Sequence, residues 1–207
     1  MIAVIDYGMG NLRSVEKALQ RSGGDARVVT TAAEIARADR IVLPGVAAFG
    51  EAMEHILEHK LDDAIRDTVA AGTPYLGFCL GMQMLFEVSY EYGEHRGLGI
   101  LPGKVVRFDF SSLPDQTGLR CPHIGWNQVH KTRDDCNGLV ATDEGTFFYF
   151  DHSYHVVPDD ASIIAATTDY GPDFVSAIQK DNIFATQFHP EKSQAAGLTV
   201  LKQFVDA

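Results

Sequence analysis

The sequence has few cysteines, few basic residues and no long apolar run, and each scarcity excludes a class of protein. Any disulfide scheme leaves one of the three cysteines unpaired and no CxxC pair occurs, which is typical of a reducing compartment; they are Cys79, Cys121 and Cys136. The sequence has 17 basic and 28 acidic side chains, and the resulting net charge of -11 disfavours a nucleic-acid partner. No apolar stretch approaches the roughly 18 residues of a membrane span, and no basic leader precedes the first apolar run. We therefore expect a cytoplasmic protein that binds neither nucleic acid nor a membrane.

Short β-forming runs alternate with helical patterns in the first half of the chain. A helical face formed by Leu12, Val15 and Leu19 separates two such runs and ends at a Gly-Gly pair. This alternation predicts a parallel sheet with helices on both faces and active residues at the carboxyl ends of the strands. The predicted strands span residues 2–7, 26–30, 41–43 and 75–78, and the helical patterns cover residues 12–19, 32–38, 53–57 and 61–69.

The pattern changes after about residue 104, where β-forming runs follow one another with short turns between them. These runs predict a β-rich, partly antiparallel flank joined to the α/β core. A final helical pattern covers residues 195–205, the polar stretch 111–118 predicts a flexible surface loop, and the 207 residues fit a single domain. The predicted strands of this half span residues 105–108, 125–130, 146–154, 163–168, 174–179 and 183–188.

A cysteine between two glycines stands where one predicted strand gives way to a helical pattern. In the run Gly77-Phe78-Cys79-Leu80-Gly81, glycine allows the sharp bend and the close approach of neighbouring chains that a nucleophile turn requires. A helix after Cys79 would direct its unpaired N–H groups at the sulfur and favour the thiolate. The N–H of Leu80 would remain free to receive a developing oxyanion.

A histidine and a carboxylate follow the last predicted strand. The run Gln187-Phe188-His189-Pro190-Glu191 supplies a base and, two residues later, an acid that can orient it. A lone cysteine is most often an inert core residue, but complementary groups at two strand ends favour a joint site. Cys79, His189 and Glu191 are therefore predicted to form a nucleophilic Cys-His-Glu triad.

Together, these two motifs resemble those of the class I glutamine amidotransferases. Within that class, the sequence is similar to one family over nearly its whole length, the glutaminase subunits of imidazole glycerol phosphate synthase. The nucleophile turn at residues 77–81 and the His-Pro-Glu run are shared by the wider class, so they identify only the chemistry. The runs DYGMGNLRS (6–14), PHIGWN (122–127) and QFHPEKS (187–193) narrow the similarity to that family. The segments that carry the similarity are residues 6–12, 44–46, 77–83, 122–127, 148–154 and 187–193.

The resemblance implies a three-layer, flavodoxin-like α/β fold, with residues 1–207 forming a single glutamine amidotransferase type 1 domain. It implies hydrolysis of glutamine to glutamate and ammonia, with no cofactor. The ammonia would pass to the cyclase subunit, a (β/α)8 barrel whose lyase reaction makes imidazole glycerol phosphate and aminoimidazole carboxamide ribotide in histidine biosynthesis. Because the chain contains no barrel, the resemblance implies a heterodimer whose glutaminase turnover is coupled to the partner's ligand.

The resemblance also assigns roles to individual residues. The backbone N–H groups of Val46 and Leu80 would form the oxyanion hole. A carboxylate suits the ammonium end of glutamine, and Gln83 would hold the amide end, although alone it would be taken for an exposed helical amide. The residues expected to bind glutamine are Gly45, Gln83, Glu91, Ser153 and Tyr154, and Asn11 and Lys192 would face the barrel.

Two positions depart from the pattern of the family. Ala47 stands where glycine is common, and its methyl group would narrow the conformations open to the oxyanion segment, although such turns accept alanine while φ stays negative. Asp151 stands where the family usually has an apolar residue, which leaves open whether its carboxylate pairs with His152.

Three other interpretations remain. The first is another cysteine hydrolase on the same scaffold, which would lack Gln83, Glu91 and the acid after His189. The second is a paralogous glutaminase subunit that supplies ammonia to a related barrel in another pathway, and the third is a non-catalytic scaffold of the barrel. We expect no metal, because the spacing matches no standard zinc site in the set Cys121, His123, His152 and His155.

Overall fold

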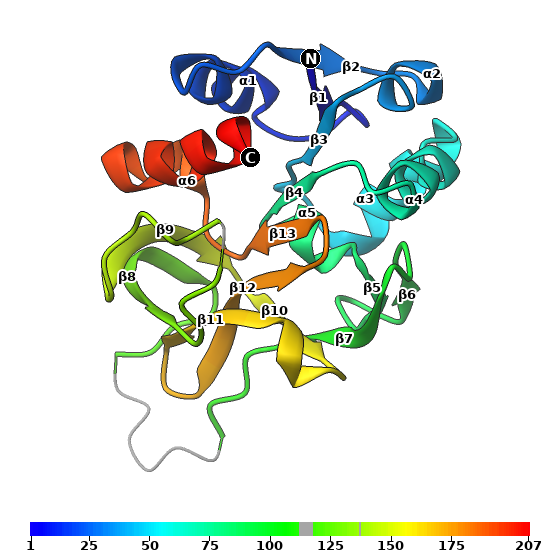
Figure 1. Cartoon of the computed structure of the whole chain (residues 1–207). Helices are drawn as coiled ribbons and strands as arrows, with labels where there is room; N and C mark the ends of the chain where they lie inside the picture. Colours follow the sequence, from blue (N-terminus) through cyan, green and yellow to red (C-terminus); the bar gives the residue numbers. More distant parts are fainter. Residues whose placement is uncertain (112–117, 137) are drawn as a thin grey trace.

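A nine-stranded sheet forms the centre of the protein, and a separate four-stranded sheet lies beside it (Figure 1). The computed structural model describes residues 1–111, 118–136 and 138–207, so most of the predicted loop 111–118 lies outside the described residues. The helices are α1 (Leu12–Arg21), α2 (Ala32–Ile35), α3 (Phe49–Glu58), α4 (Asp62–Ala70), α5 (Leu80–Gln83) and α6 (Gln194–Asp206). The strands are β1 (Ile2–Ile5), β2 (Ala26–Val29), β3 (Arg40–Leu43), β4 (Tyr75–Phe78), β5 (Phe86–Ser89), β6 (His95–Arg96), β7 (Leu101–Arg107), β8 (His123–Lys131), β9 (Thr146–His152), β10 (Tyr154–Pro158), β11 (Ile164–Asp169), β12 (Asp173–Lys180) and β13 (Ile183–Thr186).

The large sheet is parallel in one half and antiparallel in the other. Its strand order is β2-β1-β3-β4-β13-β12-β11-β8-β9. Every pair from β2 to β13 is parallel, and every pair from β13 to β9 is antiparallel. The predicted parallel core with an antiparallel flank is therefore confirmed.

Two apolar layers cover the parallel strands, one on each face. Successive side chains of a strand point to opposite faces, so Ile2 and Val4 pack with α1 and α6, whereas Ala3 and Ile5 pack with α2, α3 and α4. Figure 1 shows the same division, with α1 and α6 on one side of the strands and the other three helices opposite. The result is the three-layer α/β arrangement that the sequence predicts.

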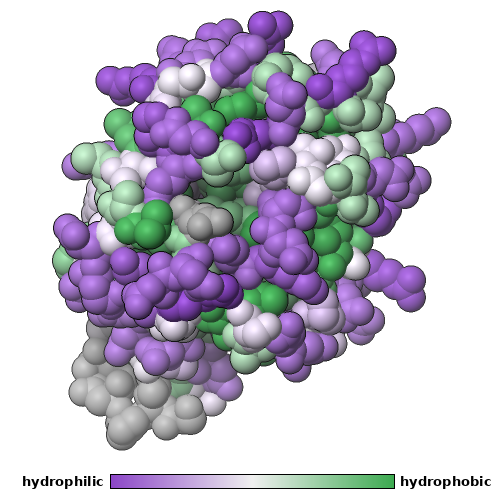
Figure 2. Space-filling view, viewed as in Figure 1, coloured by the Kyte–Doolittle hydropathy of each residue, from purple (hydrophilic) through white to green (hydrophobic). Residues whose placement is uncertain are grey.

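Most apolar side chains are held inside these layers. The face shown in Figure 2 is mostly hydrophilic, and hydrophobic residues reach it in separate patches. Within the described ranges, no helix is both long and apolar enough to cross a membrane.

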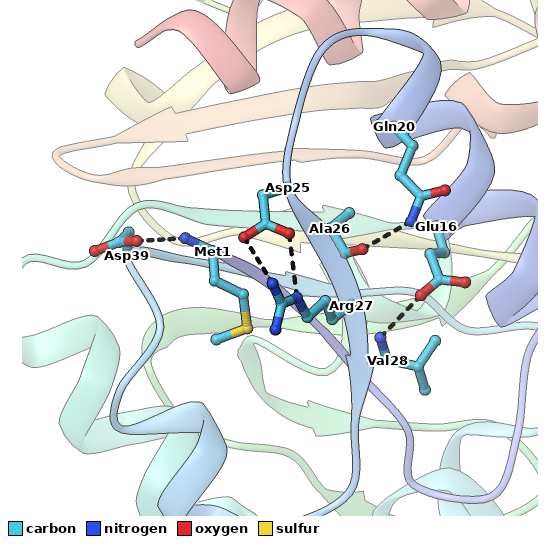
Figure 3. Close-up of polar contacts among 8 residues, drawn as sticks. All are labelled: Met1, Glu16, Gln20, Asp25, Ala26, Arg27, Val28 and Asp39. Atoms are coloured by element: carbon cyan, nitrogen blue, oxygen red, sulfur yellow. Dashed lines mark hydrogen bonds and ion pairs between the residues drawn. The ribbon is translucent and has the colours of Figure 1, made fainter.

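Strand β2 forms one edge of the large sheet, and side chains of α1 satisfy its outer backbone groups (Figure 3). Gln20 donates its amide N–H to the carbonyl of Ala26 at 3.0 Å, and the N–H of Val28 donates to the Glu16 carboxylate at 3.3 Å. Residues two apart on a strand direct their backbone groups to the same edge, so both contacts cover the unpaired side of β2. Such covering protects an edge strand against pairing with another chain.

Several predicted elements differ from the observed ones. The predicted strand 146–154 divides at Ser153, because β9 belongs to the large sheet and β10 to the small one. The helical pattern after Cys79 yields the single turn α5, and the strand expected over 183–188 ends at Thr186. Strands β5 and β6, which complete the small sheet, were not predicted.

Candidate active site

The predicted nucleophile turn lies between β4 and α5. Cys79 has φ 50° and ψ -104°, and its N–H donates to the carbonyl of Thr186 on the neighbouring β13 at 2.7 Å. A Cβ at Gly81 would lie 1.8 Å from the carbonyl oxygen of Leu43, and a Cβ at Gly77 would lie 2.7 Å from that of Gly81. Both glycines are therefore required by the contact of the turn with β3 and with itself.

A buried histidine and carboxylate lie just beyond β13. Nδ1 of His189 is 2.8 Å from Oε1 of Glu191, and the two side chains are 2% and 3% exposed. The N–H of His189 donates to the carbonyl of Tyr149 at 2.9 Å, and Ser193 donates its hydroxyl to the carbonyl of His189 at 2.7 Å. These contacts fix the ring so that Nδ1 is held by the carboxylate and Nε2 is left for another group.

The Cys79 thiol lies near enough to the His189 ring to influence its charge. Nε2 of His189 is buried without a hydrogen-bond partner in this structure. Burial alone would lower the pKa of His189, but its contacts with Cys79 and Glu191 outweigh burial and raise the pKa to about 10. The three residues predicted as a triad are therefore brought together at the carboxyl ends of β4 and β13, which are adjacent in the sheet.

A cleft of about 250 Å³ opens over Cys79. It is lined by most of the residues predicted to bind glutamine or an oxyanion, whereas His189 and Glu191 are not among its lining residues. A pocket of this kind, with a nucleophile and a few polar groups, is the usual form of a small-ligand site. Its lining consists of Val46, Ala47, Cys79, Leu80, Gln83, Glu91, Pro122, Asp151, His152, Ser153 and Tyr154.

The oxyanion segment follows β3. A Cβ at Gly45 would lie 2.7 Å from both Cβ of Leu80 and the hydroxyl of Tyr7, so Gly45 packs against the turn and does not line the cleft. Ala47 is not among the residues with positive φ, which is the condition under which alanine is expected to be accepted. As the first residue of α5, Leu80 has an N–H with no acceptor inside the helix.

Gln83 and Glu91 have protein partners in this structure. Gln83 is buried, and its amide nitrogen donates to the carbonyl of Tyr154 at 2.9 Å and to Oε1 of Gln187 at 3.1 Å. The carboxylate of Glu91 accepts the N–H of Phe49, the first residue of α3, at 2.7 Å. Neither residue is therefore the solvated side chain that it would be taken for in isolation.

Gln187 is a site residue that the sequence analysis did not assign. It stands two positions before His189 and is fully buried, and its amide nitrogen lies 3.4 Å from Sγ of Cys79. The sequence signal that could have identified Gln187 is its position directly after β13, the strand that pairs with β4 beside the nucleophile turn.

Residues 151–154, where β9 passes into β10, line the cleft. The carbonyl of Ser153 accepts from the N–H of Phe108 at 3.2 Å, and the carbonyl of Tyr154 accepts from Nδ1 of His152 at 2.8 Å. The side chain of Asp151 is exposed, and no ion pair between Asp151 and His152 occurs among the described residues.

Of the two residues predicted to face a partner, Asn11 is exposed and Lys192 is half-buried. Asn11 is exposed at the start of α1, and the ammonium of Lys192 lies 5.6 Å from the ring centre of Tyr149. Exposed apolar side chains occur on the segments that carry the site, at Val46, Ile124, Trp126 and Phe147.

Two buried histidines form a pair beside the cleft, and one of them, His152, lines it. Nδ1 of His123 lies 3.1 Å from Nε2 of His152, and the two residues are opposite each other on β8 and β9. Burial lowers the pKa of His123 to about 4 and that of His152 to about 3. In the described part of the chain, no group of three or more His, Cys, Asp or Glu side chains is placed to hold a metal ion.

The neutral pair should make the fold sensitive to acid. A histidine whose pKa is lowered by folding contributes fully above the unfolded pKa of about 6.5, and that contribution is lost as the pH falls toward the folded value. We expect the loss of unfolding free energy between pH 7 and pH 5 to be smaller in His123→Gln than in the wild type by roughly 1 to 2 kcal/mol. Urea unfolding of both proteins at both pH values measures this difference. The difference between the two proteins at pH 7 gives the cost of the substitution that does not depend on pH. Equal losses in the two proteins would contradict the expectation.

Comparison with known proteins agrees with this geometry. The sequence profile of the family described as "Glutamine amidotransferase class-I" matches residues 3–207. The "Imidazole glycerol phosphate synthase subunit HisH" of Syntrophotalea carbinolica is 50% identical over 206 residues, covering 100% of both chains. The protein of the same name from Aquifex aeolicus is 53% identical over 204 residues, covering 97% of this chain and 94% of that one. Among solved structures, "PurLQS from Thermotoga maritima" superimposes with a TM-score of 0.76 at 18% identity, over 99% of this chain and 97% of that one.

Proposed function

The chain belongs to the class I glutamine amidotransferases and, within them, to the HisH family, and we propose that Cys79, His189 and Glu191 are its catalytic triad. It is the glutaminase subunit of imidazole glycerol phosphate synthase. It hydrolyses glutamine to glutamate and ammonia, and the ammonia feeds the cyclase subunit in histidine biosynthesis. The observation that carries the triad is the meeting of the Cys79 thiol with the buried His189–Glu191 pair at the ends of adjacent strands.

The chemistry follows from the position of each group. Sγ of Cys79 attacks the side-chain carbonyl of glutamine after its proton passes to Nε2 of His189, and Glu191 stabilises the resulting imidazolium through Nδ1. His189 then gives the proton to the departing nitrogen. The nitrogen leaves as ammonia, and the glutamyl group remains bound to Cys79 as a thioester. Water attacks the thioester and releases glutamate. The ring-closing lyase step belongs to the partner subunit.

The oxyanion that forms on the attacked carbonyl needs donors in the cleft. The free N–H of Leu80 at the start of α5 suits this role, and the N–H of Val46 on the facing segment is the second candidate. Losing one such donor typically costs about 100- to 1000-fold in turnover. Glu91 is suited to the amino end of glutamine by its charge, and the Ser153–Tyr154 backbone borders the same space.

The partner we propose is the (β/α)8-barrel cyclase subunit, bound as a heterodimer. Residues 1–207 act as one domain, and the residues that we expect to meet the partner are Asn11 and Lys192, together with exposed apolar side chains of β8 and β9 at Ile124, Trp126 and Phe147. Three free cysteines fit a reducing compartment, so we place the enzyme in the cytoplasm. The proposed reaction needs no cofactor.

Reconstitution with the partner tests this function. We expect the chain to release glutamate from glutamine when it is mixed with the histidine-pathway cyclase subunit and that subunit's ligand, and to be poorly active alone. Coupled detection of glutamate measures the rate, and capture of the native partner from the source cell identifies the barrel.

A related barrel from another pathway serves as the matched control. Glutamate release that requires the related barrel and ignores the histidine-pathway cyclase would favour the paralogous subunit. Binding to the cyclase without any glutamate release would favour a non-catalytic scaffold.

A further inference from the structure

Gln187 places an amide group against the sulfur of Cys79. It is fully buried at the carboxyl end of β13, and its Nε2 lies 3.4 Å from Sγ. From this contact and the network behind it, we infer that Gln187 is a further catalytic residue, which donates an N–H to the Cys79 sulfur and stabilises its thiolate. The inference deepens the proposed function and rests on it, because it concerns the same nucleophile.

The orientation of the Gln187 amide is determined by Gln83. Nε2 of Gln83 is within hydrogen-bond distance of two oxygens, the carbonyl of Tyr154 at 2.9 Å and Oε1 of Gln187 at 3.1 Å. A backbone carbonyl can only accept, so the nitrogen of Gln83 must face Tyr154. Its second hydrogen then requires the oxygen of Gln187, which turns the nitrogen of Gln187 toward the sulfur. Rotating the Gln187 amide by half a turn would place its NH2 group against the NH2 group of Gln83, so that two donors would face each other. It would also turn the Gln187 oxygen toward the sulfur of Cys79.

The Tyr154 carbonyl is itself held by a second donor. Nδ1 of His152 lies 2.8 Å from this oxygen and must carry the proton, which leaves Nε2 of His152 to accept from His123 at 3.1 Å. The amide nitrogen of Asn127 approaches the other ring nitrogen of His123 at 3.4 Å. In this series of hydrogen bonds every donor faces an acceptor, so the bonds have one consistent direction from Asn127 to Tyr154.

The network has a chemical consequence at the sulfur. As a thiol, Cys79 has the Asp151 carbonyl as an acceptor at 3.8 Å, and as a thiolate it has the Gln187 N–H as a donor. Hydrogen bonds to a charged acceptor are stronger than those to a neutral one, so the Gln187 contact favours the ionised form. When the proton passes to Nε2 of His189, the negative charge left on the sulfur already faces this donor.

Alkylation of Cys79 by iodoacetamide tests the role of Gln187, because the thiolate is the reacting form. We expect Gln187→Met, which removes the donor and nearly conserves the volume, to slow alkylation of Cys79 at pH 7.5 by about 10-fold or more. Mass spectrometry of the digested chain assigns the label to Cys79, and the rate at Cys121 in the same sample gives an internal reference. The reconstituted complex should show a similar fall in kcat for glutamine, with KM changed less than about threefold.

Gln179→Met is the matched control. Gln179 lies on β12 beside the start of β13, at the opposite end of that strand from Gln187, and its oxygen has no partner in this structure. We expect the control to alkylate at the wild-type rate.

Wild-type alkylation of Cys79 in a folded Gln187→Met chain would overturn the inference. If that variant does not fold, Gln187→Asn, which keeps the amide but withdraws it by one methylene, is expected to slow alkylation as well, and a wild-type rate there would be equally decisive. Alkylation needs no glutamine, so it reports on Gln187 separately. If the wild-type complex released no glutamate, the proposed function would fail whatever the alkylation rates were.

Discussion

Replacing Cys79 with alanine is expected to abolish glutamine hydrolysis by the complex while leaving the cyclisation driven by free ammonia intact. The change removes the atom that attacks the glutamine carbonyl, and loss of a catalytic nucleophile can cost roughly a million-fold in turnover. The smaller side chain fits the turn, because Cys79 makes its structural contact through its backbone N–H to Thr186. Glutamate release with glutamine, and product formation with an ammonium salt, measure the two activities on the same preparation.

Cys121→Ala is the matched control for this experiment. Its thiol lies beside the cleft and contacts the carbonyl of Ser153 at 3.7 Å, but it is not on the nucleophile turn. We expect this variant to keep glutamine hydrolysis within about tenfold of the wild type. Hydrolysis that survives in Cys79→Ala would remove the nucleophile from the proposed mechanism. Loss of the ammonia-driven reaction as well would show that the substitution damaged the assembly.

Gly81→Ala is expected to have the second largest effect, on stability. Its new methyl group would lie 1.8 Å from the carbonyl oxygen of Leu43, so α5 and β3 would have to separate. Overpacking against backbone costs about 3 kcal/mol or more, which is a large fraction of the 5–15 kcal/mol of a typical domain. We expect the melting temperature to fall by roughly 6 °C or more and glutamine hydrolysis to be lost with it. Thermal unfolding followed by circular dichroism measures the change.

Gly23→Ala separates this clash from the general cost of replacing glycine. Gly23 has φ 94° and no atom within 4 Å of the position of a Cβ, so alanine there meets backbone strain without a collision. The expected cost is about 1 kcal/mol. If the two variants melted at the same temperature, the close approach of Gly81 to β3 would not be the reason that this position requires glycine.

The parallel core and the three residues of the proposed triad could be predicted from the sequence because both have local signals. Buried parallel strands are continuous apolar runs, and four such runs in the first half were placed within two residues of β1, β2, β3 and β4. The triad was predicted because each of its two segments follows such a run and carries a reactive side chain; its catalytic role stays a proposal. The neighbouring positions of β4 and β13 then follow from the sheet.

Other features depend on contacts between distant segments and had no local signal. β6 is two polar residues, His95 and Arg96, that become a strand only by pairing with β5. The prediction of one strand over 146–154 was wrong because nothing local marks Ser153 as the point where the chain changes sheets. Gln187 was missed for a similar reason, since its partners Gln83 and Cys79 lie more than 100 residues away along the chain.

The place of β13 in the large sheet makes assembly of the proposed triad depend on a segment that is synthesised after all the other strands. This strand is the last one made, yet it pairs with β4 on one side and β12 on the other. Until the segment from Ile183 onward has left the ribosome, β4 has an open edge and Cys79 has neither its base nor the acceptor for its N–H. A growing chain, or one truncated before Ile183, therefore holds Cys79 without the groups that we propose activate it.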